Sequence, residues 1–460
     1  MSGSATETIA DYITGASFLD LPDEVVRKAK FWLLDSLGCG FGGVQSVLGQ
    51  TAIRALTEIS SGNAGVLGCN EKVSVGTSAF LNAMLINALD YDDCSVAGHL
   101  SSTLVGTLLA MNKQTDVSGR HFLLSYVTGY EIGSRVAKAG WPTAERFAEV
   151  WGLGTNQTFG AVAAAAKLRE LNKSQTLNAL GIAGAGAPVP SGQKWGWDNR
   201  PLTWIKDAVA MPAQTGVVSA TLAEAGFLGC RDILDGPQGF WRMAASDRCD
   251  FDVLTRGLGS DYFIMDASIK TWSCCWFIHP TLDIVKSIVQ DNGLTHQDIA
   301  QIDVWSLTDL SEMFTAIEPE ELVDAQFSLP YCVALVLLGI EPGPGWFNRD
   351  LFHDETVLSI GSRVKIHPDS TCDDIFHNED RRISARVVVT TGSGAGFEGS
   401  APAPRGTPML PVSEHEITEK YLAMAVPVTG AEKARALKEF VLALETYDSV
   451  AALSELTAAH

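Results

Sequence analysis

Apolar residues recur at helical spacing along the first 260 residues, which predicts a mainly helical N-terminal part. Pro22 and the acids after it resemble a helix start, and the apolar stripe that follows runs toward the glycine-rich residues 38–43, which indicate a stop or a close helix contact. A second long apolar pattern, from Val73 to Leu109, is interrupted once, over residues 88–102. Helical patterns then continue to about residue 226.

The pattern changes after residue 267. Alternating apolar and polar residues predict three strands, at residues 302–307, 363–366 and 383–390. We expect one apolar helix from Ala325 to Leu335, a turn-rich connector over 392–411, and helix again over 416–444. The chain is therefore predicted to hold an α/β unit at about 268–404, which lies between a long helical part, 1–267, and a helical tail, 405–460.

Composition narrows the class of protein. The 460 residues are 46% hydrophobic and 19% charged, which is typical of a globular chain with more than one core. A net charge of -21 argues against nucleic acid as a partner. We expect no signal peptide and no membrane span, because the chain starts without a basic and apolar leader and has no long apolar run. The nine cysteines lack a Cys-x-x-Cys pair, which favours reduced thiols in a cytoplasmic-type compartment, with mitochondria or peroxisomes still open.

Chemistry-bearing side chains concentrate in residues 269–283, where Lys270, Cys274, Cys275 and His279 lie in an apolar setting. Burial is expected to lower the pKa of the lysine and to favour a neutral histidine, the states that proton transfer near neutral pH requires. The alternative is a buried turn with one packed histidine. For the two cysteines, packing is the better expectation, because the chemistry below needs no covalent intermediate.

The interruption at residues 88–102 carries three carboxylates and one histidine, His99. One interpretation is a solvated loop in which Asp93 and Ser102 cap helices. A metal site is the other, but the spacing fits no standard ligand set. Farther on, Glu131 and Arg135 are spaced to pair on one helix face in a structural role.

The glycine- and proline-rich residues 181–206 combine tryptophans with cations. Rings can form apolar walls and cations can hold an anionic group, so we predict a loop over a pocket. Surface cation–π packing is the alternative. The candidates for the substrate pocket are Trp151, Gly154, Thr155, Trp195, Trp197, Arg200, Trp204 and Cys274.

Several segments together resemble the MmgE/PrpD family, which includes 2-methylcitrate dehydratase, cis-aconitate decarboxylase and an iminodisuccinate epimerase. The matching segments follow the family's order: Leu89-Asp90-Tyr91-Asp92-Asp93 with His99, Gly129-Tyr130-Glu131, Thr158-Phe159-Gly160-Ala161, Lys206 with 213–216, Lys270 with Cys274-Cys275 and His279-Pro280, 324–328, and Lys420-Tyr421. The resemblance implies a mainly α fold, in which a large all-helical domain built from both chain ends carries a smaller α/β lid domain. It also implies a homodimer and an interdomain cleft that works without metal or organic cofactor.

Carried over to this sequence, the resemblance implies His99, Lys206, Lys270 and His279 as catalytic residues, supported by Asp90 and Asp93. Two departures stand out. Many relatives have a histidine where this chain has Gly154, and the histidine-glycine that often follows the Lys206 position is replaced by residues 208–211. Fewer imidazoles and more tryptophan suggest a substrate that is larger or less charged than a tricarboxylate.

The step shared within the family is the formation or quenching of a carbanion next to a carboxylate, which needs a base, an acid and positive charge. We expect the two lysines to bind a carboxylate and stabilise charge, and His99 and His279 to act as acid and base. Asp90 and Asp93 are expected to orient His99 or the loop. Three functions remain open: a lyase that removes water or carbon dioxide from a carboxylic acid, an epimerase or isomerase that moves a proton at the carbon next to a carboxylate, and a binding protein without activity. The lyase is preferred.

Overall fold

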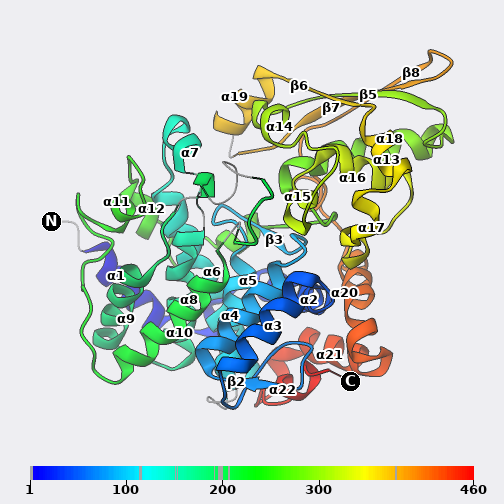
Figure 1. Cartoon of the computed structure of the whole chain (residues 1–460). Coiled ribbons are helices and arrows are strands. Elements are labelled where there is room, and N and C mark those ends of the chain that lie inside the picture. The colour runs from blue at the N-terminus through cyan, green and yellow to red at the C-terminus, as the bar shows by residue number, and fades with distance from the viewer. Residues whose placement is uncertain are drawn as a thin grey trace.

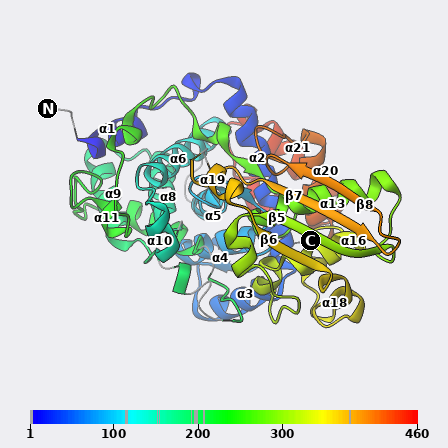
Figure 2. The same cartoon turned by 90° about the horizontal axis from the view of Figure 1, so that it is seen from above.

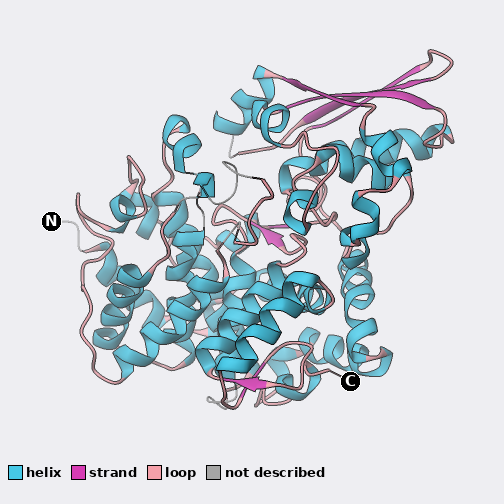
Figure 3. Ribbon diagram, in the orientation of Figure 1, coloured by secondary structure: helices cyan, strands magenta, loops and turns pink. Residues whose placement is uncertain are grey.

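The computed structural model describes residues 4–112, 117–150, 152, 154–190, 192–194, 200–205, 208–378 and 381–459. The fold is mainly helical, with a small sheet at one end of the molecule (Figures 1 and 3). Within these ranges no helix is both long enough and apolar enough to cross a bilayer.

Eight helices that pack on one another form the body of the helical part. They are α1 (Ala5–Gly15), α2 (Asp23–Val44), α4 (Val75–Asn87), α5 (Leu100–Asn112), α6 (Gly119–Ala139), α8 (Gly154–Leu168), α9 (Lys173–Gly186) and α10 (Ala210–Glu224). The close crossing of α6 and α8 depends on glycine: a Cβ at Gly129 would lie 2.8 Å from the carbonyl oxygen of Gly160. The glycines of α2 likewise mark close contact and not a stop, because the helix continues to Val44.

Smaller elements surround this body, and several lie in the second half of the chain. They are α3 (Val47–Ile59), β1 (Ala64–Gly65), β2 (Lys72–Val73), α7 (Ala144–Val150), α11 (Phe240–Met243), α12 (Phe251–Thr255), α14 (Thr308–Met313), α17 (Arg349–Phe352), α18 (Glu355–Gly361), α19 (Ser370–Asn378) and α22 (Leu453–Leu456).

The predicted pair of Glu131 and Arg135 on α6 is confirmed, because Nε of Arg135 lies 2.6 Å from Oε1 of Glu131.

The end of the chain returns to the N-terminal helices. The helix expected over 416–444 is two helices, α20 (Glu414–Thr429) and α21 (Ala431–Leu442), because Gly430 turns the backbone between them at φ 80°. Both pack against α2 (Figure 1). A Cβ at Gly38 of α2 would lie 2.9 Å from Cα of Tyr421. The division into 1–267 with 405–460 and 268–404 stays a prediction, which this contact supports.

A four-stranded sheet in the order β6-β5-β7-β8 lies over the helical part at one side (Figures 1 and 2). Its strands are β5 (Ile299–Ser306), β6 (Val364–Pro368), β7 (Ala385–Thr391) and β8 (Gly396–Ala401). β5 and β6 are parallel, and the other pairs are antiparallel. Alternate residues of β7 are buried, and α13 (His279–Asn292) packs on β7 and β8.

Two expectations for this part were wrong. The connector expected over 392–411 contains β8, an edge strand whose glycines and lack of buried residues hide it from a periodicity argument. The single helix expected from Ala325 is broken into α15 (Leu322–Gln326) and α16 (Leu329–Leu337), because the Ser328 hydroxyl caps the second helix and Pro330 lies in its first turn.

Candidate functional site

A cavity of about 470 Å³ lies between the helical part and the α/β part of the chain. Elements from both parts line it. The charged and titratable residues of its described lining are Asp90, His99, Lys138, Asp266, Lys270, Cys94, Cys275, Arg381 and Arg382. The remaining lining is largely aromatic and aliphatic, so the polar groups are few and are placed within apolar walls.

A two-residue ladder brings the two candidate segments together. β3 (Asp93–Cys94) pairs antiparallel with β4 (Ser268–Ile269), so that Asp93 lies opposite Ile269. Lys270, the next residue, thereby reaches Asp90 across 180 positions of sequence, and its Nζ lies 2.5 Å from Oδ1 of Asp90. The same ammonium donates to the carbonyl oxygen of Cys274 at 3.2 Å. Lys270 and Asp90 are each 1% exposed, so the ion pair is buried.

The turn after α4 aims Asp90 at these partners. Its backbone has φ 49°, in the left-handed region, and its N–H donates to the carbonyl oxygen of Asn87 at 2.9 Å. Asp and Asn occupy this region more readily than most residues, which suits an aspartate to this position.

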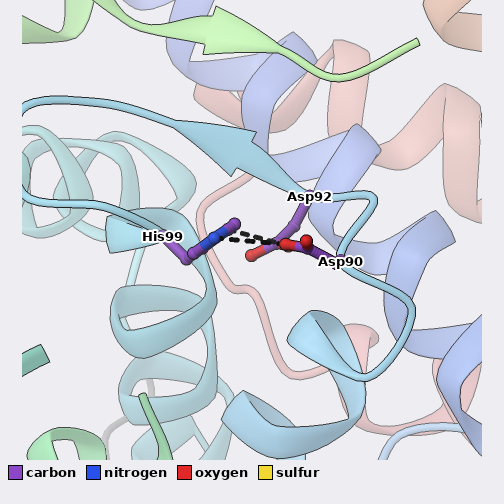
Figure 4. A group of neighbouring side chains, drawn as sticks. All are labelled: Asp90, Asp92 and His99. Carbon is purple, nitrogen blue, oxygen red and sulfur yellow. Dashed lines mark ion pairs between the residues drawn. The ribbon is translucent and has the colours of Figure 1, made fainter. Parts of the chain in front are cut away.

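The His99 ring lies between two carboxylates. Nε2 is 3.3 Å from Oδ1 of Asp90, and Nδ1 is 3.1 Å from Oδ1 of Asp92. Figure 4 shows both aspartates directed at the ring from the loop that precedes α5. An imidazole can donate at both nitrogens only as imidazolium. The prediction that His99 and Asp90 belong to one constellation thus agrees with the geometry, while their catalytic role stays a prediction.

Asp92 is the residue of this group that sequence reasoning left out. Its carboxylate accepts hydrogen bonds from the Asn87 amide, at 3.1 Å, and from the Ser102 hydroxyl. Burial alone would raise the pKa of Asp92, but the nearby His99 ring, the charge of Lys270 and the hydrogen bond from Ser102 lower it. Ser102 was expected to cap a helix, and here its side chain instead binds Asp92. The Asp-Tyr-Asp-Asp motif pointed to the right turn, but not to the aspartate that holds Nδ1.

The expected pKa of Lys270 was wrong in direction. Burial disfavours the ammonium, as anticipated, but the Asp90 carboxylate, followed by Cys94, Cys275 and Asp92, outweighs burial and raises the pKa of Lys270 above its ordinary value. Lys270 is therefore a fixed positive charge near neutral pH. Stabilisation of negative charge suits it better than removal of a proton.

The Asp93 carboxylate contacts the start of α5 and the middle of α6. It accepts from the Tyr130 hydroxyl at 2.7 Å and from the backbone N–H of Ser101 at 3.1 Å. The second bond caps α5, as one sequence interpretation expected. Burial and the nearby Asp92 charge raise the pKa of Asp93 to about 7. Its predicted supporting role is thus directed at the helix and not at the ring.

Replacing Asp93 with asparagine is expected to change how stability depends on pH. The folded protein holds the Asp93 proton with a pKa of about 7, above the value of about 3.9 in an unfolded chain. The stability that this proton contributes is complete below about pH 4 and is lost as pH rises through about 7. Relative to the wild type, the free energy of unfolding of Asp93→Asn should therefore increase from about pH 5 to about pH 8. Urea titrations across this range test it, and parallel profiles would contradict it.

His279 lies outside the cavity lining, at the first turn of α13, and is fully buried. Its Nε2 is 3.2 Å from the carbonyl oxygen of Cys274, the group that also accepts from Lys270. Burial and the Lys270 charge lower its pKa well below the ordinary value, so the expected neutral state is confirmed. Its predicted role as acid or base stays untested, and the contact suits a residue that fixes the Cys274 carbonyl.

The predicted pocket residues are dispersed. Cys274 is buried, and burial with the neighbouring Cys332 raises the pKa of its thiol, which favours packing over nucleophilic chemistry. Arg200 donates to Asp324 at 2.7 Å. Gly154 begins α8, the Thr155 hydroxyl donates to the carbonyl oxygen of Pro188 at 2.8 Å, and Trp204 lines a separate hollow beside Met84.

None of these five residues is in the described lining of the main cavity. The remaining candidates, Trp151, Trp195, Trp197 and Lys206, lie outside the described residues. From the same loop, Gly192 and Leu202 do line the cavity, as the expectation of a loop over a pocket requires.

Three cations of the lining were not singled out from sequence. Lys138 comes from the end of α6, and Arg381 and Arg382 precede β7. The Arg381 guanidinium lies over the Trp141 ring, 2.9 Å from its centroid, which is a contact between the α/β part and the helical part. The adjacent arginines were a visible signal, but nothing in their spacing joined them to His99.

Asp90, Asp92 and His99 could also be viewed as metal ligands, because one ligand atom from each lies within 4.8 Å of the others. The donor set fits a cation poorly, since the Lys270 ammonium already lies 2.5 Å from Oδ1 of Asp90. A metal ion there would face a buried positive charge at close range.

Comparisons with known proteins identify the family of the chain. The family model of the MmgE/PrpD N-terminal domain matches residues 7–251, and that of the C-terminal domain matches residues 272–446. A cis-aconitate decarboxylase-like protein, oryM, of Aspergillus oryzae is 27% identical over 483 residues, covering 99% of this chain and 97% of the relative. The cis-aconitate decarboxylase of Aspergillus terreus is 24% identical (98% and 95% covered), as is that of Homo sapiens (99% and 95% covered). Because the two family models together span most of the sequence, the chain belongs to the MmgE/PrpD family.

Proposed function

We propose that this protein is a lyase that removes carbon dioxide or water from a carboxylic acid without a cofactor. The observation that carries the proposal is the His99 imidazole, held between Asp90 and Asp92 at the wall of an interdomain cavity. The curated relatives bear the names of decarboxylases, which places lyases among the reactions of this family.

In a decarboxylation the bond between the carboxylate carbon and its neighbour breaks, and the electron pair stays on the neighbouring carbon. That carbanion is stabilised as an enolate if a carbonyl or carboxyl group is conjugated with it. His99 then donates one proton from nitrogen to carbon.

Lys270 supplies the positive charge for this step. Its ammonium is buried beside Asp90 and lines the same cavity. It therefore stabilises negative charge that develops on an oxygen of the substrate. Lys206 stays a second candidate for that role by resemblance.

A dehydration uses the same groups in another order. A base removes the proton next to a carboxylate, and the hydroxyl group leaves as water once it has been protonated. An epimerase is the alternative. Two groups on opposite faces of one carbon can remove and return a proton without loss of atoms, and His99 on the cavity wall could be one of them, whereas Lys270 would only stabilise the charge.

Mass spectrometry of the reaction products tests the lyase. The wild-type protein is incubated with di- and tricarboxylic acids and with their alkyl analogues. The proposal expects an unsaturated or shortened acid, lighter than its precursor by water or by carbon dioxide. A product of unchanged mass and inverted configuration would favour the epimerase instead of the lyase. No reaction with any of the acids would favour a binding protein.

We also propose that the protein is a homodimer, as the family resemblance implies. Apolar side chains that solvent would reach in a monomer gather on one face of α10: Met211, Val218 and Leu222 are 40%, 44% and 37% exposed. Ile205, near the start of this helix, is 44% exposed. A second copy of the chain is the partner that would cover this face.

Replacing Val218 with glutamate is expected to shift the protein from dimer to monomer, because a buried carboxylate at the interface would lack a partner. Light scattering after gel filtration measures the mass. The control is Leu228→Glu, because Leu228 is 80% exposed and lies outside α10. A monomeric wild type would contradict the proposal, as would a Val218→Glu dimer of unchanged stability.

A further inference from the structure

The cavity next to His99 has two aromatic walls. Phe277, Phe327 and Phe376 line it from the α/β part, and Trp141, Phe147 and Phe263 line it from the helical part. Phe277 and Phe376 meet edge to face with ring centroids 5.4 Å apart, and Trp141 stacks on Phe147 at 5.1 Å. We call these six residues the aromatic walls. They favour an apolar group in the cavity, because transfer of such a group out of water is favourable there.

The rest of the lining extends this character. Leu202, Val323, Ile383 and Met409 also face the cavity, and Met409 is 53% exposed. A small substrate with only carboxylate groups would leave much of this apolar surface in contact with water or with carboxylate oxygens. A carboxylate placed against the apolar surface loses its hydration and gains no hydrogen bonds in return.

Only a minority of the residues in the described lining carry a charge. The cations are Lys138, Lys270, Arg381 and Arg382, to which His99 adds a charge when it is protonated, and the carboxylates that oppose them are Asp90 and Asp266, with Asp92 beside the His99 ring. Lys270 pairs with Asp90, and His99 lies between Asp90 and Asp92. Arg381 and Arg382 are adjacent in sequence at one wall, and arginine is the side chain best shaped to hold a carboxylate by paired hydrogen bonds.

We propose that the substrate class of this site is a dicarboxylic acid with an apolar alkyl or aryl substituent. One carboxylate binds at Arg381 and Arg382, the carbon that gains or loses a proton lies at His99, and the substituent lies against the aromatic walls. This assignment rests on the lyase proposed above and narrows its substrate. It separates this chain from relatives that are named for cis-aconitate, a tricarboxylate.

Binding of unreactive acids tests the assignment without requiring turnover. Isothermal titration of the whole protein uses succinate and its 2-methyl, 2-butyl and 2-hexyl derivatives. If the substituent is transferred from water to the aromatic walls, the dissociation constant should fall about threefold to fourfold for each methylene until the cavity is filled. A further pair isolates charge from size: 2-isobutylsuccinate and tricarballylate have nearly the same shape, but only the second has a third carboxylate.

The expected result is that 2-isobutylsuccinate binds at least tenfold more tightly than tricarballylate. Arg382→Met should weaken every succinate by about tenfold or more, through loss of a charge-assisted hydrogen bond, and should leave the gain per methylene unchanged. Arg349→Met is the matched control, because Arg349 pairs with Glu321 at the surface and is not in the described lining. If Arg382→Met does not fold, the wild-type series still decides.

Tighter binding of tricarballylate, an alkyl series of constant affinity, or no measurable binding of any alkylsuccinate would overturn the substrate class. The lyase proposal is judged separately. Turnover of a tricarboxylate together with a flat alkyl series would keep the lyase and reject this substrate class, whereas a steep series without any turnover would do the reverse.

Discussion

His99→Gln should lower kcat/KM by a factor on the order of a hundred or more, because the variant has no side chain that can carry the transferred proton. Glutamine can still donate a hydrogen bond to one of the two carboxylates that hold the ring, Asp90 or Asp92. Steady-state kinetics on the acid that the wild type converts measure the effect, and circular dichroism checks that the variant folds.

The control for this experiment is His353→Gln. His353 lies at the surface, 2.8 Å from Glu318, and its side chain is 67% exposed. We expect this variant to keep the wild-type rate. Comparable rates for wild type and His99→Gln would remove His99 from the mechanism, and equal losses in both histidine variants would point to a general effect on the protein.

Lys270→Met should lose activity and also a large part of the protein's stability. The substitution leaves the Asp90 carboxylate, which is 1% exposed, without its ammonium partner. Breaking a buried ion pair on one side costs about 3–5 kcal/mol. The buried pair is the reason why this variant is expected to lose stability as well as activity. Urea denaturation measures the loss.

A second substitution separates the two effects. Asp90→Asn combined with Lys270→Met removes both charges, and asparagine tolerates the backbone at φ 49°. The double variant should recover much of the free energy of unfolding but none of the turnover. Recovery of activity would show that Lys270 matters only for folding, and a single Lys270→Met variant of wild-type stability would contradict the buried pair.

Much of the fold could be predicted from periodicity. The apolar pattern from Val73 to Leu109 predicted α4, α5 and the interruption between them, and spacing alone predicted the pair of Glu131 and Arg135. The edge strand β8 could not be found in this way. One of its faces is half buried against α13, but Gly396, Gly399 and Ser400 leave no regular alternation of apolar and polar residues in its sequence.

The candidate site was predicted from residue types and from family resemblance, but its electrostatics could not be. The pKa of Lys270 depends on Asp90, which is distant in sequence and is brought near only by the β3–β4 ladder. The choice between Asp92 and Asp93 as the partner of His99 depends on side-chain direction within one turn. Neither the pKa of Lys270 nor the partner of His99 can be predicted from the spacing of neighbouring residues in the sequence.

The structure also separates candidate residues that are close together in the sequence. Lys270 and His279 are within ten positions of one another, yet one lines the cavity and the other begins a helix behind it. The shared Cys274 carbonyl joins them, so His279 can influence Lys270 without touching a substrate. Arg381 and Arg382 approach from the other side of the cleft, which no short motif could have indicated.

The central claim is that His99 gives a solvent-derived proton to a carbon next to a carboxylate. It is tested most directly by running the wild-type reaction in heavy water and determining, by mass spectrometry and NMR, where deuterium enters the product. For decarboxylation, the account predicts one deuterium per product molecule at the carbon that lost the carboxylate, and no incorporation above the uncatalysed rate with His99→Gln. A decarboxylated product without deuterium, or the same incorporation with His99→Gln, would contradict it.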